Sequence, residues 1–175
     1  VEETGALPAE APFYAEHGIE LFADPDEAAA LFLATDERSL RGLLAAHLDR
    51  ARPGDYVALC AFLAMNAENE AAMAELRNAV SKVTGVATTL GFGPRFLHST
   101  GQAHKGGPAT GLFLQFTDRP SADLPVPNRR LTFGQVIAAQ ARGDFEVLTI
   151  RGRRALRIHF AMGAEKGLKR LVGAL

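Results

Sequence analysis

Residues 56–63 read YVALCAFL, and this stretch decides the fold because every one of its positions is apolar. Continuous apolarity over such a length is typical of a strand that is covered on both faces, as in a parallel sheet. A helix is predicted over residues 70–83 from apolar positions at helical spacing: Met73, Leu76, Val80 and Val83. Gly85 ends that helix, and residues 86–90 form the next apolar strand. Strand, helix and strand in this order predict a βαβ unit with a right-handed crossover.

Further strands are predicted outward from this unit, at residues 18–23, 112–117 and 154–160. The last of these reads RALRIHF, and its alternation of polar and apolar positions is typical of a half-exposed strand at the edge of a sheet. The sequence therefore predicts an α/β fold, a three-layer αβα sandwich around a mainly parallel sheet of four or five strands.

The remaining helices are predicted from their capping residues. Asp24 and Ser39 are expected to cap two helices that lie between the strand at 18–23 and the strand at 56–63. Thr132 begins a capping-box pattern, so a helix is expected to start there and to stop at Gly143. Asp144 is then expected to cap a short separate helix, and a last helix closes the chain.

Composition limits the class of protein. The chain has 175 residues, enough for one domain, with 47% hydrophobic and 22% charged residues, as in an ordinary globular protein. Residues 1–14 are rich in Ala, Pro and Glu and are expected to form an acidic linker or tail, which leaves residues 15–175 as the domain. The net charge of −1 argues against nucleic acid or an anionic membrane as a partner recognised by bulk charge.

The compartment is inferred from cysteine use and from the absence of targeting patterns. Cys60 is the only cysteine and lies in an apolar run, so we expect a buried free thiol in a reducing, cytoplasmic environment. No apolar run approaches the roughly 20 residues that span a bilayer, and no secretory signal is visible. The chain begins with Val rather than Met, which suggests a piece of something longer.

Residues 91–111, GFGPRFLHSTGQAHKGGPATG, separate two of the apolar strands and are the best candidate for a functional loop. Six glycines and two prolines exclude a single regular element. The loop carries the following candidate site residues: Arg95, Ser99, Thr100, Gln102, His104 and Lys105. Ligands of open α/β sheets bind beyond the carboxyl ends of strands, and this loop leaves such an end. The alternative, that the glycines serve tight turns and the polar side chains satisfy the loop backbone, stays open.

The candidate residues differ in how readily packing explains them. Lys105 is the strongest candidate, because a lysine beside histidine and glutamine in a glycine-rich loop is hard to assign to packing. For His104 a catalytic and a structural role are equally favoured, while His98 is expected to be structural. His47 is expected to be a core histidine and His159 a surface one. No metal site is expected, because a pair of histidines at 98 and 104 would lack a third ligand.

Residues 91–117, GFGPRFLHSTGQAHKGGPATGLFLQFT, resemble the C-terminal part of the glucose-6-phosphate isomerase module in bifunctional transaldolase/glucose-6-phosphate isomerases. Further stretches agree with that family in the same order: PGDYVALCAFL, DLPVPNRRLTFG, AAQARGDFEVL and RALRIHF. The resemblance covers about residues 18–160. It implies a sugar-isomerase-like fold and the interconversion of glucose 6-phosphate and fructose 6-phosphate without a metal or organic cofactor.

The resemblance also implies roles for individual residues. The family's C-terminal portion contributes a glutamine and a lysine close to the substrate, and Gln102 and Lys105 fit these positions. Lys105 would then hydrogen-bond the ring oxygen or neighbouring hydroxyls during ring opening, with His104 as the other acid/base candidate. Arg95, Ser99 and Thr100 are expected to bind the substrate because of their place in the polar loop, not because of the resemblance. The family's base glutamate and phosphate loop belong to earlier parts of the enzyme, and no matching segment occurs here.

Two functions from different classes stay open. The chain is either the C-terminal domain of such an isomerase, inactive alone and completed by upstream isomerase and transaldolase domains in cis or in trans, or a free-standing module without catalysis. The latter would bind a sugar phosphate or another subunit.

Overall fold

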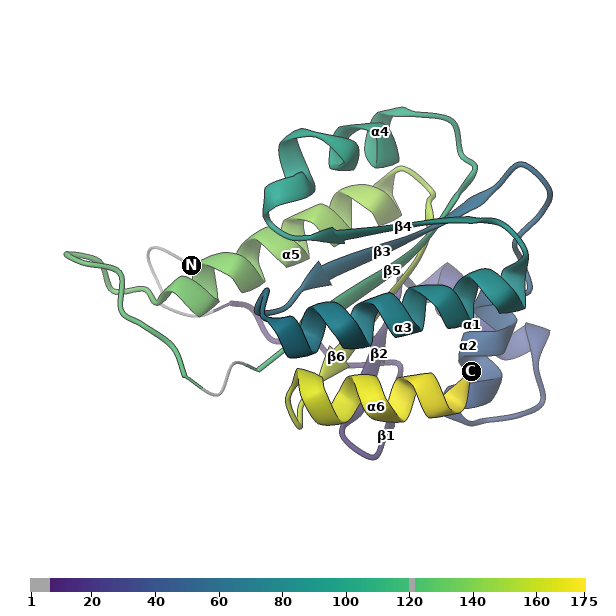
Figure 1. Cartoon of the computed structure of the whole chain (residues 1–175), viewed down its shortest axis with the longest axis horizontal. Helices are drawn as coiled ribbons and strands as arrows, with labels where there is room; N and C mark the ends of the chain where they lie inside the picture. Colours follow the sequence, from purple (N-terminus) through teal and green to yellow (C-terminus); the bar gives the residue numbers. More distant parts are fainter. Residues whose placement is uncertain (1–6, 120–121) are drawn as a thin grey trace.

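The computed structural model describes residues 7–119 and 122–175, and within them a six-stranded sheet lies between two layers of helices (Figure 1). The strands are β1 (Tyr14–Glu16), β2 (Ile19–Phe22), β3 (Tyr56–Phe62), β4 (Ala87–Phe92), β5 (Gly111–Asp118) and β6 (Arg154–Phe160). Their order is β1-β2-β6-β5-β3-β4. The last four in this order run parallel, whereas β2 pairs antiparallel with β6 and β1 forms a hairpin with β2. The predicted three-layer α/β class is confirmed.

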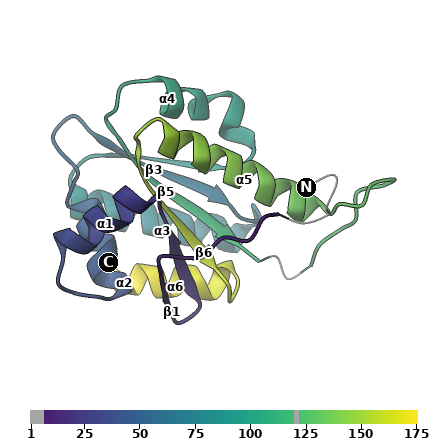
Figure 2. The ribbon, with the colours of Figure 1, turned by 180° about the vertical axis from the view of Figure 1, so that it is seen from behind.

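The helices divide unequally between the two faces of the sheet (Figures 1 and 2). One face is covered by α1 (Pro25–Ala34), α2 (Leu40–Leu48), α3 (Ala67–Thr84) and α6 (Ala164–Ala174). Of the described elements, the other face carries only α4 (Thr100–Gly106), a preceding 3-10 turn (Arg95–His98) and α5 (Phe133–Ile150). The larger core lies on the first face, and a smaller apolar cluster around Phe113 and Phe145 lies on the second. The second face is therefore covered by fewer of the described helices than the first.

The capping signals confirm their helices. The side chains of Asp24 and Ser39 accept hydrogen bonds from the backbone N–H groups of Glu27 and Gly42, as N-caps do. Thr132 forms the expected capping box with the third helical residue of α5.

The expectation that RALRIHF is an edge strand is wrong, because β6 lies between β2 and β5. Its polar residues do not face open solvent. Arg157 is buried under aromatic rings, and His159 Nδ1 hydrogen-bonds Thr117 Oγ1 at 2.9 Å. Alternation in β6 thus reflects two differently packed faces of one interior strand.

The expected helix break at Gly143 is also wrong, because α5 continues without interruption to Ile150. Gly143 has no positive φ and keeps helical geometry, so it costs helix stability without ending the helix. Asp144 is no cap: it is buried within the helix and its carboxylate pairs with Lys105.

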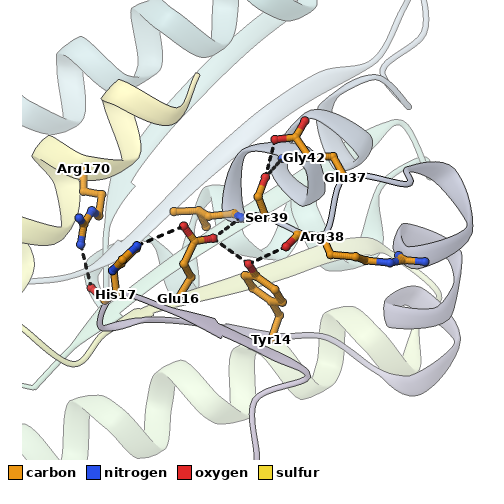
Figure 3. A network of polar contacts seen from close by, with 9 residues as sticks. Tyr14, Glu16, His17, Glu37, Arg38, Ser39, Gly42 and Arg170 are labelled. Atoms are coloured by element: carbon orange, nitrogen blue, oxygen red, sulfur yellow. Dashed lines mark hydrogen bonds and ion pairs between the residues drawn. The ribbon is translucent and has the colours of Figure 1, made fainter.

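The N-terminal hairpin was missed from the sequence, because β1 has only three residues and begins inside the expected tail. Figure 3 shows how it is anchored: Glu16 Oε2 accepts hydrogen bonds from Tyr14 Oη and from the backbone N–H of Leu40, both at 2.7 Å. The carboxylate thus sits at the N-terminal end of α2, where negative charge is stabilising. Glu10 and Tyr14 of the expected tail contact the domain, and residues 1–6 lie outside the described residues.

Candidate functional site

The segment 91–111 is a crossover rather than a loop at one edge of the sheet. It leaves the carboxyl end of β4, forms the 3-10 turn and α4, and enters the amino end of β5. Since β4 and β5 belong to one parallel sheet, the segment has to run from the carboxyl edge to the amino edge. Arg95 accordingly lies near the carboxyl edge, whereas His104 contacts Tyr56, the first residue of β3. The expected position at the carboxyl ends therefore holds only for the start of the segment.

His104 lies against the amino end of the sheet, half-buried between aromatic rings. Its Nδ1 is 3.0 Å from Tyr56 Oη, in hydrogen-bond contact, and its ring packs edge-on against Phe113 with centroids 5.3 Å apart. Burial lowers the pKa of His104, an effect that the nearby Asp144 carboxylate opposes. The imidazole is therefore neutral at pH 7, with one ring nitrogen engaged by tyrosine.

Lys105 is held in an ion pair beneath α4. Its Nζ lies 2.7 Å from Asp144 Oδ1, and the two side chains are only 16% and 4% exposed. Arg153 supports the same turn by donating from Nη2 to the backbone carbonyls of Lys105 and Gly107. Two adjacent residues of α4 can therefore take part in acid/base chemistry. His104 contacts the sheet through Tyr56, and Lys105 contacts α5 through Asp144.

The other predicted residues of the segment lie outside this buried contact. Ser99, Thr100 and Gln102 are exposed, and Gln102 Nε2 donates to the carbonyl of Leu97 at 2.7 Å. Exposed Arg95 donates to Met65 Sδ at 2.7 Å. The structure thus separates the predicted set into an exposed group and the more buried pair His104 and Lys105.

Two of the segment's glycines allow close packing. A Cβ at Gly93 would lie 2.6 Å from the ring of Phe62, and one at Gly101 would lie 2.9 Å from the carbonyl oxygen of Phe96. Both approaches are shorter than a real Cβ tolerates, which favours the structural explanation for these two positions.

A cavity of about 660 Å³ opens at the carboxyl ends of β3, β5 and β6, far along the strands from His104. The connection after β3 leads through α3 on one face to β4, and the connection after β5 leads through α5 on the other face to β6. The chain therefore switches direction between β3 and β5, which is where open α/β sheets bind ligands. This cavity was not predicted from the sequence, because the sequence does not reveal the order of the strands in the sheet.

The cavity is lined by both apolar and polar side chains. Its wall is built by residues of β2, β3 and α5 and by the residue after β3: Phe22, Phe62, Leu63, Phe133, Ile137, Ala138 and Ala141. Its charged and hydrogen-bonding groups are Glu10, Glu20, Thr117, Asp118, Arg119, Asp123, Arg142, Arg157 and His159. The size and the mixed lining are typical of small-molecule sites.

Two proton-exchanging groups lie at the strand ends in this cavity. Burial raises the pKa of Asp118, whose Oδ2 accepts from the backbone N–H of Ala164 at 3.3 Å. Burial lowers the pKa of His159, which is not the surface residue expected from the sequence. Both shifts go toward the neutral form, and both side chains line the cavity, where they can exchange hydrogen bonds with a bound molecule.

The described residues include neither a candidate metal cluster nor a membrane-spanning helix. No group of three or more His, Cys, Asp or Glu residues could hold a metal ion in that part of the chain. None of the helices described is long and apolar enough to cross a membrane. Cys60 is a buried free thiol, as expected, and burial raises its pKa. His47 is a core residue, also as expected.

Comparison with known proteins identifies the fold alone. No protein-family model and no curated protein matches the chain. The fold is similar to that of a hypothetical protein from Thermus thermophilus, with a TM-score of 0.64 and 18% sequence identity. The match covers 85% of this chain and 41% of that protein, so the chain spans less than half of its length.

Proposed function

We propose that this chain is the C-terminal domain of an aldose–ketose isomerase that interconverts glucose 6-phosphate and fructose 6-phosphate, in a bifunctional transaldolase/isomerase of the reducing cytoplasm. The resemblance of residues 91–117 to that family supports the proposal. The domain contributes one part of a composite active site, and upstream isomerase and transaldolase domains contribute the rest, in cis or in trans.

The observation that carries the proposal is the way α4 and the turn before it present their residues. Ser99, Thr100 and Gln102 are exposed together on this outer segment, and none of them lines the 660 Å³ cavity. Exposed polar groups that line no cavity do not enclose a substrate by themselves. In this proposal an upstream domain supplies the second surface that covers them.

Each residue then has a stated role. Gln102 orients the sugar hydroxyls, while Arg95, Ser99 and Thr100 bind the phosphate or neighbouring oxygens. Lys105 exchanges its contact with Asp144 for the sugar's ring oxygen during ring opening. His104, held by Tyr56, is the alternative proton carrier for this step. Isomerisation needs no metal or organic cofactor in this scheme.

The test is a coupled isomerase assay on three samples: this chain, the upstream isomerase domain, and their mixture or fusion. We expect turnover only when both parts are present. Gln102→Ala in the fused enzyme should lower kcat/KM about 10-fold or more, whereas Gln140→Ala, an exposed glutamine on α5, should leave it unchanged. Equal activity of the Gln102→Ala and parent fusions would contradict the assigned role of α4.

A second candidate is a subunit-interaction module without catalysis, which the exposed apolar residues of α5 favour. Val147 and Ile150 are 37% and 77% exposed on this helix, and Phe133 and Ile137, which line the cavity, are also exposed. Exposed apolar side chains that lie close together are common at protein interfaces. Sedimentation of the chain alone and with the upstream domain distinguishes the candidates: association without isomerase activity in the assembled protein favours the module.

A further inference from the structure

Arg157 is an unusual residue for the middle of an interior strand. Its side chain is only 7% exposed, and its guanidinium lies 4.2 Å from the ring centroid of Phe22 and 5.2 Å from that of Phe145. Arginine is rarely buried unless it is paired, and here the two rings hold the guanidinium in place. The fold therefore holds a rigid cation on the face of the sheet that α4 and α5 leave partly open.

The acidic partner of Arg157 does not come from the sheet or from a helix. Glu10, in the segment that precedes β1, places its Oε2 2.6 Å from Arg157 Nη2. The other oxygen of the same carboxylate lies 3.4 Å from Arg142 Nε on α5. One carboxylate is thus shared by two arginines, although it is itself 36% exposed.

This shared carboxylate lies at the wall of the 660 Å³ cavity. Glu10, Arg142 and Arg157 all line it, as do the apolar side chains of Phe22, Ile137 and Ala138. Thr117 and His159 lie in the same cavity and can hydrogen-bond a polar group of an occupant. The arrangement has two cations for an anionic group, an apolar wall for a hydrophobic body, and the position of the switch-point site.

We propose that this cavity binds a small organic anion, and that Glu10 occupies the place of the ligand's phosphate or carboxylate until the ligand displaces it. Both kinds of anionic group present pairs of oxygens that match the donors of arginine, as the carboxylate of Glu10 does. The apolar body of the ligand lies against Phe22 and Ile137. The N-terminal segment is then a built-in competitor for the site.

The alternative is that Glu10 and Arg157 only fasten the N-terminal segment to the sheet. Both explanations predict that the pair stabilises the protein, so stability does not separate them. They differ in what removal of Glu10 does to anion binding. If Glu10 occupies Arg157 in about nine molecules of ten, the apparent affinity for an anionic ligand is about 10-fold weaker than the intrinsic affinity. Removing Glu10 then raises the apparent affinity by the same factor.

The experiment is isothermal titration calorimetry of the whole chain with phenyl phosphate, inorganic phosphate, phenol and fructose 6-phosphate. Glu10→Ala should bind phenyl phosphate about 10-fold more tightly than the parent chain. Glu20→Ala is the matched control, because it removes a carboxylate from the same cavity without releasing Arg157. Phenyl phosphate should bind more tightly than inorganic phosphate and phenol, since only it has both the anion and the apolar body. Tighter binding of fructose 6-phosphate would instead assign a hydroxylated ligand and overturn the apolar assignment.

Arginine variants complete the test. In the Glu10→Ala background, Arg157→Met should weaken phenyl phosphate binding by about 30-fold or more. If that variant fails to fold, as judged by circular dichroism, Arg142→Met in the Glu10→Ala background tests the role of the arginines instead. It too should weaken phenyl phosphate binding. Equal affinities of the Glu10→Ala, Glu20→Ala and parent chains would overturn the proposal, as would unchanged binding without the arginine. The inference does not depend on isomerase activity, because no residue of α4 lines this cavity.

Discussion

Lys105, the strongest candidate site residue, also makes a structural contact through its ion pair with Asp144. The sequence suggests a loop lysine with little part in the core, yet its ammonium pairs with a carboxylate that is 4% exposed inside α5. Removing one member of a buried pair leaves the other charge unpaired, which costs more than the pair itself contributes. A variant at position 105 therefore changes stability as well as any chemistry.

Lys105→Ala is expected to lower the free energy of unfolding by about 3 kcal/mol, because Asp144 loses its cation in a dry environment. Urea denaturation measures this directly. The double variant Lys105→Ala/Asp144→Ala should be more stable than Lys105→Ala alone, since it no longer buries an unpaired charge. If Lys105→Ala unfolds at the parent urea concentration, the ion pair does not contribute to the fold, and any loss of isomerisation is then due to chemistry.

The burial of His47 makes the stability of the protein depend on pH. Its side chain is fully buried, neither ring nitrogen has a hydrogen-bond partner among the described residues, and Glu27 Oε1 lies 3.4 Å from Nδ1. Burial lowers the pKa of His47 below its usual 6.5, although Glu27 opposes the shift. The unfolded chain therefore binds a proton near pH 6.5 that the folded chain does not yet bind, so stability decreases as the pH falls below about 6.5.

Urea denaturation between pH 7.5 and pH 5 measures that slope. His47→Leu should reduce it, while His104 and His159, whose pKa values burial also lowers, retain the remainder. Leu44→Ala is a suitable control, because an apolar core truncation lowers stability without changing proton uptake. A slope in His47→Leu as steep as in the parent chain would show that His47 is not protonated differently in the two states.

At the scale of the element, α5 is the helix that local signals describe least well. The capping box at Thr132 correctly predicted its start, since the cap acts within one turn. Gly143 and Asp144 then suggested a stop and a new start, but the helix continues because its buried residues pack on the sheet. A glycine weakens a helix by an amount that tertiary packing can exceed.

Gly143→Ala should therefore stabilise the protein by about 0.5–1 kcal/mol, because alanine loses less backbone entropy in a helix and a Cβ at this position meets none of the described atoms within 4 Å. Thermal unfolding would show a rise of a few degrees. Gly167→Ala on α6 is the opposite case, since its Cβ would lie 2.2 Å from Phe160 Cδ1, and it should lower the melting temperature. A lower melting temperature in Gly143→Ala would indicate that α5 is not continuous.

At the scale of the whole molecule, strand order decides which residues meet. The chain places β6 inside the sheet, which buries Arg157 and brings Glu10, Arg142 and His159 to one cavity from positions far apart in sequence. It also places α4 away from this cavity, with His104 at the amino end of β3. The two candidate sites are therefore separate, one on α4 and one at the switch point.

Amide hydrogen exchange tests this strand order without reference to function. The amides of β6 should exchange as slowly as those of β3 and β5, because all three strands are paired on both sides. Those of β4, which pairs with β3 alone among the described strands, should exchange faster. Fast exchange throughout β6 would contradict its interior position and would favour the edge position that its alternating sequence predicted.

The sequence by itself determined the α/β class, the three apolar strands β3, β4 and β5, and the starts of α1, α2 and α5. These signals are local: a cap acts over three or four residues, and an apolar run shows that a strand is covered whatever covers it. The same locality explains why Lys105 was predicted as a candidate site residue without its partner Asp144, which was expected to be a helix cap. Only the tertiary structure decided the strand order, the burial of Arg157, the pairing of Lys105 with Asp144 and the cavity at the carboxyl edge. Each of these joins residues tens of positions apart, and their contact depends on how crossovers arrange the strands, which no local pattern encodes.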